Sequence, residues 1–318
     1  MGKETARQRL KGKKGSRRRT AHRKMAASLP ILLGLFVLFM ASLLLRGYGC
    51  DRPHNYWFDQ YLYTMIGFQL TKDVTDYTSI HVYNRETRKG RDLPDHYNKP
   101  LFEHPPLYCY LISIVNRLSD PTNPTSKRFS FQLARRNGSR VSLIFGCLTI
   151  FVIYFLAAKL YDHRVGLLAA LLLSIDPVHW ICSQRVWMAT TLAFFVASAL
   201  LFYVLGRKRA PYFILSGICI GLASLTKLLG ILTLFIILLY TLLAERDLFR
   251  KRQFIILIIS PFILQIPWIL WNIKVYGFDF LTQNVFWHRT IRLVESVWVI
   301  GALFAVLLTA VFMAFTKN

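Results

Sequence analysis

One acidic side chain stands among aromatic residues in the stretch WFDQYLYTMIG, residues 57–67. The acid is Asp59, and the amide of Gln60 follows it directly. A carboxylate can accept the proton of an attacking hydroxyl group, which makes Asp59 a candidate general base. Acidic residues are also mostly exposed to solvent, and on composition alone that simpler interpretation is the favoured one. The position of Asp59 relative to the surrounding helices must decide between a general base and an ordinary exposed acid.

Several groups that could bind an anion occur later in the chain. Arg and Lys hold phosphate through charge-assisted hydrogen bonds, so their gathering at one depth would suit a phosphate at a membrane surface. The candidates are His104 in EHPPL, Arg185 in CSQRVW, Lys227 in SLTKLLG, and His288 and Arg292 in FWHRTIR.

Each of these residues has a simpler interpretation. His104 can cap a helix opened by the double proline, and Arg185 can extend its charge to the membrane surface. Lys227 can mark an outer turn, although a Lys between two apolar segments is costly unless it reaches an interface or a partner. Tyr61 and Tyr63 can belong to an aromatic belt.

A second carboxylate, Asp176, lies in LSIDPVHW three residues before His179. The five cysteines show no spacing typical of a metal site. A divalent metal ion is therefore expected only if the fold brings Asp59 and Asp176 together.

The elements that must position these residues are membrane helices. The chain has 318 residues, of which 54% are hydrophobic, and its mean hydropathy is +0.38. A helix needs about 20 apolar residues to cross a bilayer. We expect an all-α polytopic membrane protein with about eight transmembrane helices, in the apolar runs 25–45, 141–158, 167–181, 188–205, 212–226, 228–244, 254–271 and 297–315.

The net charge of +24 is concentrated at the N-terminus. Residues 1–24 are rich in Lys and Arg, with almost no apolar content, so we expect a disordered basic tail in the cytoplasm that can touch anionic membrane lipid. No aromatic residue is interleaved there, which argues against nucleic-acid binding. Residues 25–318 would form the transmembrane domain.

The distribution of basic loops predicts the topology. The segment PPLYCYLISIV, residues 105–115, is too short for a span and suits an interfacial or partly inserted helix. The short basic loops GRKRAP and ERDLFRKRQ then fall inside. Residues 46–140 become one long external loop, and Asp59 lies near its start.

Several motifs in the same order resemble the GT-C superfamily of membrane glycosyltransferases. The branch concerned is the family 39-like one, which holds protein O-mannosyltransferases and the transferases that attach aminoarabinose to lipid A. WFDQYLYTMIG resembles the acidic element of the first external loop, and FEHPPLYCYL resembles the family's KPPL or HPPL element. SRVSLIFGC, LLSIDPVHWICSQRVWMATTLAFF, GICIGLASLTKLLG and FWHRTIR resemble later elements.

This resemblance implies a GT-C-like bundle with interfacial helices in the first external loop. It implies an inverting transfer of a sugar from a polyprenyl-phosphate donor to an acceptor hydroxyl on a protein, lipid or glycan. Asp59 would be the base. The donor phosphate would be held by His104, Arg185, Lys227, His288 and Arg292, and the supporting residues would be Gln60, Tyr63 and Asp176.

Two departures from the family pattern leave an alternative open. Ala189 stands where many relatives have a second acid, and relatives are commonly longer. A catalytically inactive relative that binds the lipid carrier, or acts as a partner subunit, is the second hypothesis. A transporter is less favoured, since the spans show few buried ionisable groups and no visible inverted repeat. The expected location is a cell membrane, or the endoplasmic reticulum in a eukaryote.

Overall fold

The described part of the chain is built from helices. The computed structural model describes residues 30–31, 33–50, 57–79, 100, 104–119 and 131–277. Within these residues, no strand forms beyond one isolated antiparallel bridge between Thr78 and Pro100. The expectation of an all-α protein is therefore confirmed. The basic tail, His288, Arg292 and the expected span 297–315 lie outside the described residues.

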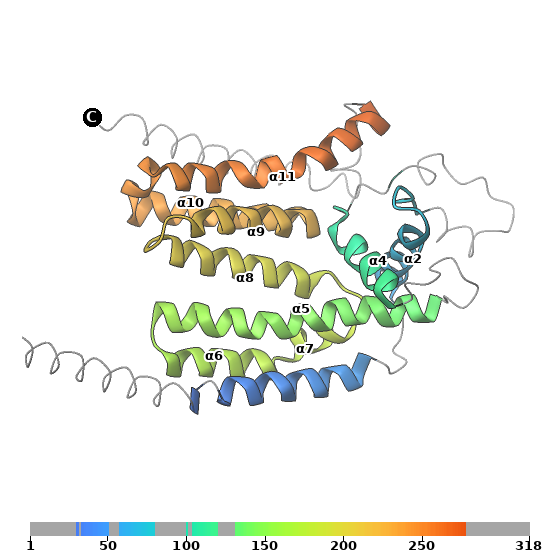
Figure 1. Ribbon diagram of the computed structural model, residues 1–318, viewed down its shortest axis with the longest axis horizontal. Helices are drawn as coiled ribbons and strands as arrows, with labels where there is room; N and C mark the ends of the chain where they lie inside the picture. The colour runs from blue at the N-terminus through green and yellow to red at the C-terminus, as the bar shows by residue number, and fades with distance from the viewer. Residues whose placement is uncertain are drawn as a thin grey trace, which may run out of the picture.

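Long helices run side by side with alternating directions (Figure 1). Leu33–Cys50 is the first, here called helix 1. The others that form the bundle are α5 (Phe131–Leu160), α6 (His163–Ile175), α7 (Pro177–Gln184), α8 (Ala189–Gly206), α9 (Tyr212–Thr226), η2 (Leu228–Ile231), α10 (Leu232–Ala244), η3 (Arg246–Arg250) and α11 (Arg252–Tyr276).

Not all of these helices are long enough to cross a bilayer alone. By length and composition, helix 1, α5, α8 and α11 qualify, and the bent pair α6–α7 can be counted as a fifth span. The apolar helices α9 and α10 are shorter. The protein is a multi-pass membrane protein, and the eight crossings expected from hydropathy are not established by the described residues.

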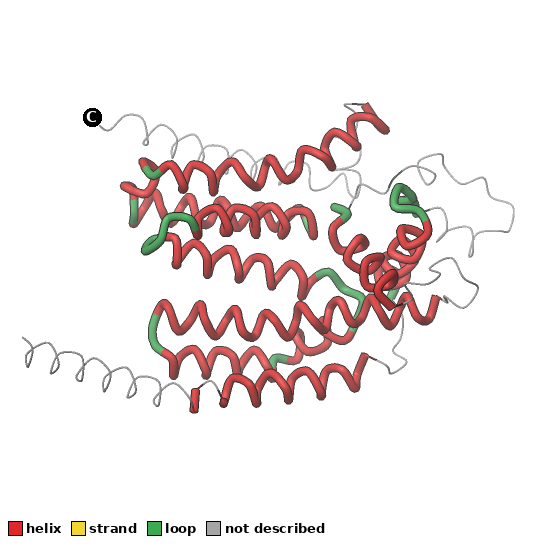
Figure 2. The backbone as a smooth tube through the Cα atoms, in the orientation of Figure 1, coloured by secondary structure: helices red, strands yellow, loops and turns green. Residues whose placement is uncertain are grey.

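The expected span 167–181 is one of the places where the structure differs from the hydropathy analysis. It contains a break, because α6 ends at Ile175 and α7 begins at Pro177, bent by 61° (Figure 2). Pro177 has no backbone N–H to continue the hydrogen bonding of α6. Asp176 lies between the helices in extended backbone, and its Oδ1 accepts a hydrogen bond from the His179 N–H (2.6 Å). The sequence pair Asp-Pro thus ends one helix and starts the next.

Two short helices lie at one end of the bundle. They are α2 (Phe58–Lys72) and α4 (Leu107–Ser119), and they pack against each other and against the start of α5 (Figure 1). The segment 105–115 was expected to form a short helix rather than a span, and α4 agrees with this. The boundaries of the expected external loop 46–140 shift, because helix 1 continues to Cys50 and α5 begins at Phe131.

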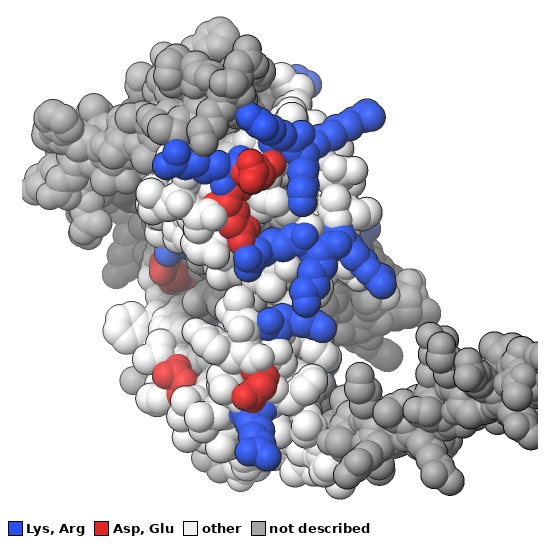
Figure 3. Space-filling view, turned by 90° about the vertical axis from the view of Figure 1, so that its left-hand side faces the viewer, with Lys and Arg blue, Asp and Glu red and all other residues white. Residues whose placement is uncertain are grey.

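The opposite end of the bundle carries exposed basic side chains. The turns that join α5 to α6, α8 to α9 and α10 to α11 all lie there, and Figure 3 shows Lys and Arg outnumbering acids on this face. We call it the basic end, and the other the α2–α4 end. Exposed cations of the basic end are Lys159, Arg164, Arg207, Lys208, Arg209, Arg246, Arg250, Lys251 and Arg252.

Small residues let two of the helices approach closely. Gly217 and Gly221 of α9, four residues apart, face α11. A Cβ atom at Gly217 would lie 2.7 Å from the backbone oxygen of Leu257, and one at Gly221 would lie 3.2 Å from the Cα of Pro261. Helices in membranes commonly pack through such small-residue pairs. This contact fixes α11 against α9.

We expect Gly217→Ala to destabilise the protein, although alanine is the better helix former. The new methyl group meets the backbone of α11, and such overpacking costs about 1–3 kcal/mol. Gly34→Ala is the matched control, because its Cβ would come no closer than 3.9 Å to Leu167. Thermal unfolding in detergent should show a lower midpoint for Gly217→Ala alone. Equal midpoints would contradict the close contact.

Candidate functional site

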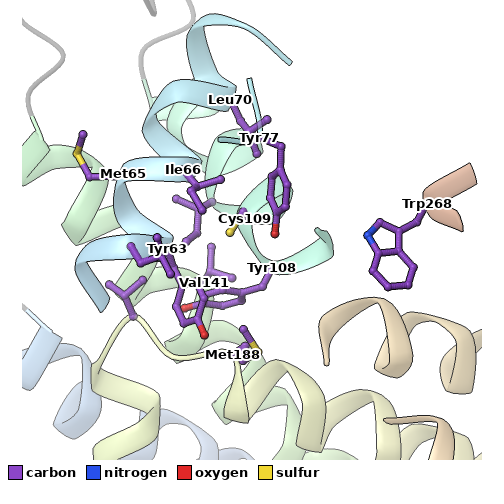
Figure 4. Close-up of a cluster of buried hydrophobic side chains, with 13 residues drawn as sticks. Tyr63, Met65, Ile66, Leu70, Tyr77, Tyr108, Cys109, Val141, Met188 and Trp268 are labelled. Atoms are coloured by element: carbon purple, nitrogen blue, oxygen red, sulfur yellow. The ribbon is translucent and has the colours of Figure 1, made fainter. Parts of the chain in front are cut away.

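A cluster of buried apolar residues holds the α2–α4 end together. Figure 4 shows most of its labelled side chains gathered between α2 and α4, with Met65 directed away from them and Trp268 of α11 to one side. Val186 and Met188, in the loop between α7 and α8, belong to the same cluster. Apolar burial of this kind is the main force that positions the short helices. Several of the polar residues predicted from sequence lie on this cluster or beside its members in the chain.

Asp59 lies in the first turn of α2 and is exposed. Its neighbour Gln60 is 2% exposed, and the Nε2 atom of its side chain has no hydrogen-bond partner in the protein. The arrangement leaves the Asp59 carboxylate accessible at the edge of the cluster, with an unsatisfied amide beside it.

Tyr63 and His104, both predicted site residues, lie side by side. Tyr63 follows Asp59 by four residues, so the two lie one turn apart along α2. The Tyr63 ring packs edge-on against the His104 ring, with ring centres 5.6 Å apart. The His104 backbone oxygen accepts a hydrogen bond from the hydroxyl of Tyr77 (3.1 Å). His104 is therefore fixed close to the turn that follows Asp59.

Ser142 of α5 connects three separate segments. Its hydroxyl lies 2.7 Å from the buried hydroxyl of Tyr108 in α4 and donates to the Trp187 carbonyl (3.0 Å). Its backbone oxygen accepts from the Thr190 hydroxyl (3.0 Å) at the start of α8. Tyr108 in turn packs edge-on against Tyr63, at 5.7 Å between ring centres. Ser142 thus couples α2 and α4 to the loop that carries Arg185.

Arg185 follows the last residue of α7 and is half-buried. Its guanidinium carbon lies 5.3 Å from the ring centre of Trp187, a cation–π distance. Among the described residues, no carboxylate forms an ion pair with Arg185. The described part of the chain thus gives Arg185 an aromatic neighbour and no acidic one.

Lys227 is exposed and directly follows α9. Its neighbours Leu225 and Leu228 pack against the same apolar cluster that holds α2 and α4. The chain turns back here so tightly that a Cβ atom at Gly230 would overlap the backbone of Ala223. The motif SLTKLLG is thus a close turn that holds a lysine at this end of the bundle.

A polar network also connects α2, α4 and α5. Asn116 donates to the Thr71 hydroxyl (3.0 Å), and Asn137 donates to the Asn116 side-chain oxygen (3.0 Å). Arg140 donates to the Asn137 side-chain oxygen (3.2 Å). Asn116 and Asn137 are fully buried. Such a satisfied network fixes one relative placement of the three helices.

The titratable groups inside the cluster are held neutral. Burial raises the pKa of the Cys109 thiol to about 12 and raises the pKa of Tyr77 well above its ordinary value. Neither group can act as a base near neutral pH.

Asp176 has a different environment from Asp59. It caps α7, as described, and lies near the guanidinium of Arg46 from helix 1. Among the described residues, no three His, Cys, Asp or Glu side chains gather as a metal site would require. The supporting role of Asp176 stays a prediction, and so do the roles of His288 and Arg292, which lie outside the described residues.

Sequence reasoning missed two residues that form hydrogen bonds to segments far along the chain. Arg46 directly follows the apolar run 25–45 and is fully buried. Ser142 was only one polar residue within an apolar run. The available signals were an Arg directly after an apolar run and a Ser two residues after the Arg of the SRVS motif, and neither reveals a partner far along the chain.

Comparison with known proteins gives two positive findings. A sequence family described as dolichyl-phosphate-mannose-protein mannosyltransferase matches residues 103–271. The crystal structure of ArnT from Cupriavidus metallidurans in the apo state matches with a TM-score of 0.58 and 20% sequence identity. That match covers 81% of this chain and 45% of ArnT, so the chain spans less than half the length of that structure. No curated protein sequence matches the chain significantly.

We expect Ser142→Ala to loosen the α2–α4 end. The change leaves the buried Tyr108 hydroxyl without this partner, at a cost of about 1–3 kcal/mol. Thr149→Val on the same helix is the control, since the Thr149 hydroxyl donates to Phe145 of its own helix (2.7 Å). Hydrogen exchange of α4 and of residues 185–188 should speed up in Ser142→Ala. Unchanged exchange in both variants would show that Ser142 does not couple these segments.

Proposed function

Because the chain belongs to the dolichyl-phosphate-mannose-protein mannosyltransferase family, we propose that it transfers a sugar from a polyprenyl-phosphate donor to an acceptor hydroxyl. The family match and the ArnT-like fold confirm the GT-C resemblance seen in the sequence. The acceptor belongs to a protein, a lipid or a glycan at the membrane surface.

One observation carries this proposal. An exposed carboxylate, Asp59, shares the α2–α4 end with two cations, Arg185 and Lys227, that have no acidic partner among the described residues. A polyprenyl phosphate keeps its tail in the bilayer and its charge at the surface. A base and phosphate-binding cations at one end of a membrane bundle suit such a donor.

The proposed chemistry is a single displacement. Asp59 accepts the proton of the acceptor hydroxyl, whose oxygen then attacks the anomeric carbon of the donor sugar. The bond from that carbon to the phosphate oxygen breaks, and polyprenyl phosphate leaves with the electron pair. The new glycosidic bond has the inverted configuration.

Cations around the leaving phosphate supply the electrostatic stabilisation. Arg185 and Lys227 neutralise its charge as it develops, which is commonly the largest catalytic contribution. His104 contacts the same phosphate from the α4 side. His288 and Arg292 join them in this proposal on the family pattern alone. Gln60 and Tyr63 support Asp59.

A second candidate function rests on Ala189. This residue is the exposed first residue of α8, at the place where many relatives have an acid. Without that acid, the protein could hold the lipid carrier without transferring the sugar. The two candidates differ in whether Asp59 matters for turnover.

The first test compares Asp59→Asn with wild type, using radiolabelled polyprenyl-phosphate sugars and purified protein. Loss of the base should lower turnover by about 10²–10⁴-fold. Asp73→Asn is the matched control, because Asp73 follows the same helix α2 at its other end and accepts from Thr75 (2.9 Å). The control should keep wild-type turnover.

The outcomes separate the two candidate functions. Turnover in wild type and Asp73→Asn, but not in Asp59→Asn, supports the transferase. Binding of the lipid-linked sugar without turnover in all three proteins supports the carrier-binding relative. Equal turnover in all three would remove Asp59 as the base.

The same proposal places the basic end in the cytoplasm, because short basic loops are retained on that side. The α2–α4 end and Asp59 then face outward. Lys208→Cys probes the basic end and Val74→Cys, at a position 51% exposed, probes the other. A membrane-impermeant maleimide should label Val74→Cys on intact cells and Lys208→Cys only after lysis. The reverse pattern would invert the topology.

A further inference from the structure

Arg46 of helix 1 is a charged side chain with no exposed surface. Its Nη2 atom donates to the backbone oxygens of Leu173 (3.2 Å) and Ser174 (3.0 Å), in the last turn of α6. Its guanidinium carbon lies 5.6 Å from the ring centre of Trp180 in α7. The side chain therefore lies where the bent pair α6–α7 breaks.

The break leaves partial charges at the end of α6 and at the start of α7, and Arg46 and Asp176 carry the opposite charges. The last carbonyl groups of a helix lack partners within the helix and carry partial negative charge. Arg46 donates to two of these carbonyls, while Asp176 caps the positive N-terminus of α7. In a membrane, freed backbone groups must find such partners within the protein.

The last turn of helix 1 also holds the far end of α7. Gln184 donates to the Arg46 backbone oxygen (3.3 Å), and the Cys50 thiol lies 3.9 Å from the Ser183 backbone oxygen. Gly49 approaches so closely that a Cβ atom would overlap the Gln184 side chain. One helix thus contacts α7 at both ends, and Arg185 follows α7 directly.

Arg46 is poorly explained as a device for stability alone. Its Nε and Nη1 atoms are buried without hydrogen-bond partners in the protein, and so are both ring nitrogens of His179. Buried charges with incomplete pairing are costly, and apolar replacements are often neutral or stabilising. A role in fixing one arrangement of α6 and α7 explains why such a costly buried charge is present and why it contacts both helices.

We propose that Arg46 is a positioning residue that holds the broken pair α6–α7 and thereby places Arg185 relative to Asp59. The inference rests on the proposed function for the roles of Arg185 and Asp59. Helix 1 is suited to the task, because its last turn contacts α7 and Arg185 follows α7 directly.

The direct test measures geometry without any need for activity. Spin labels at Phe58→Cys in α2 and Ile181→Cys in α7 report the separation of the two elements by pulsed electron spin resonance. Both positions are exposed, at 48% and 43%. Cys182→Ala removes the one native thiol in the described residues that is not buried. Arg46→Met should broaden the distance distribution, and Arg46→Lys should restore most of it.

Leu35→Ala is the control for general loosening. Leu35 is a buried residue of the same helix, packed with Ile150 and Ala170 away from α7. The Leu35→Ala substitution should lower thermal stability and leave the distance distribution as narrow as in wild type. If Arg46→Met stays as narrow as wild type, or if Leu35→Ala broadens it equally, the positioning role is overturned.

The activity readout separates this inference from the proposed function. In an active enzyme, Arg46→Met should raise KM for the lipid-linked donor by about tenfold, a loss of about 1.4 kcal/mol in ground-state binding, with a smaller change in kcat. Leu35→Ala should leave KM unchanged. The protein could lack transferase activity while Arg46→Met, but not Leu35→Ala, still broadens the distance distribution. That result would support the positioning role and contradict the proposed function. An unchanged KM despite broadening would overturn the link to Arg185.

Discussion

Backbone groups inside a membrane must be hydrogen-bonded within the protein, and this constraint organises the structure. Irregular backbone occurs at the α6–α7 break, in the loop before α8 and in the turn after α9. Each has its own internal solution. Arg46 and Asp176 bond backbone groups at the break, and Ser142 bonds the loop at Trp187. In the turn after α9, the Gly230 N–H donates to the Lys227 backbone oxygen (2.7 Å).

These irregular segments lie at or toward the end of the bundle where α2 and α4 pack. The short helices contribute apolar residues to one shared cluster, and their polar residues are left at its edge. Strong packing and an accessible carboxylate thus occur within the same helix. Tyr63 faces the cluster while Asp59, one turn earlier, is exposed. A rigid support for exposed reactive groups is what a positioned active site requires.

Much of this arrangement could be predicted from sequence, because long apolar runs and turn residues are local signals. The run 212–226 coincides with α9, and the segment 105–115 contains most of the short helix α4, as expected. The break at Asp176 was hidden, since hydropathy does not register a change of direction. The partners of Arg46 and Ser142 were hidden too, because they are 127 and 45 residues away in sequence and depend on packing.

The inward direction of the Arg46 side chain has a consequence for the bilayer around helix 1. Hydropathy places the end of the first span at Leu45, yet the side of helix 1 that includes Leu44, Leu45 and Tyr48 is exposed at 68%, 57% and 70%. Because Arg46 is buried, the exposed side of helix 1 carries no charged group between Leu45 and Cys50. A bilayer around this last turn would therefore meet an apolar and aromatic surface instead of a costly charge.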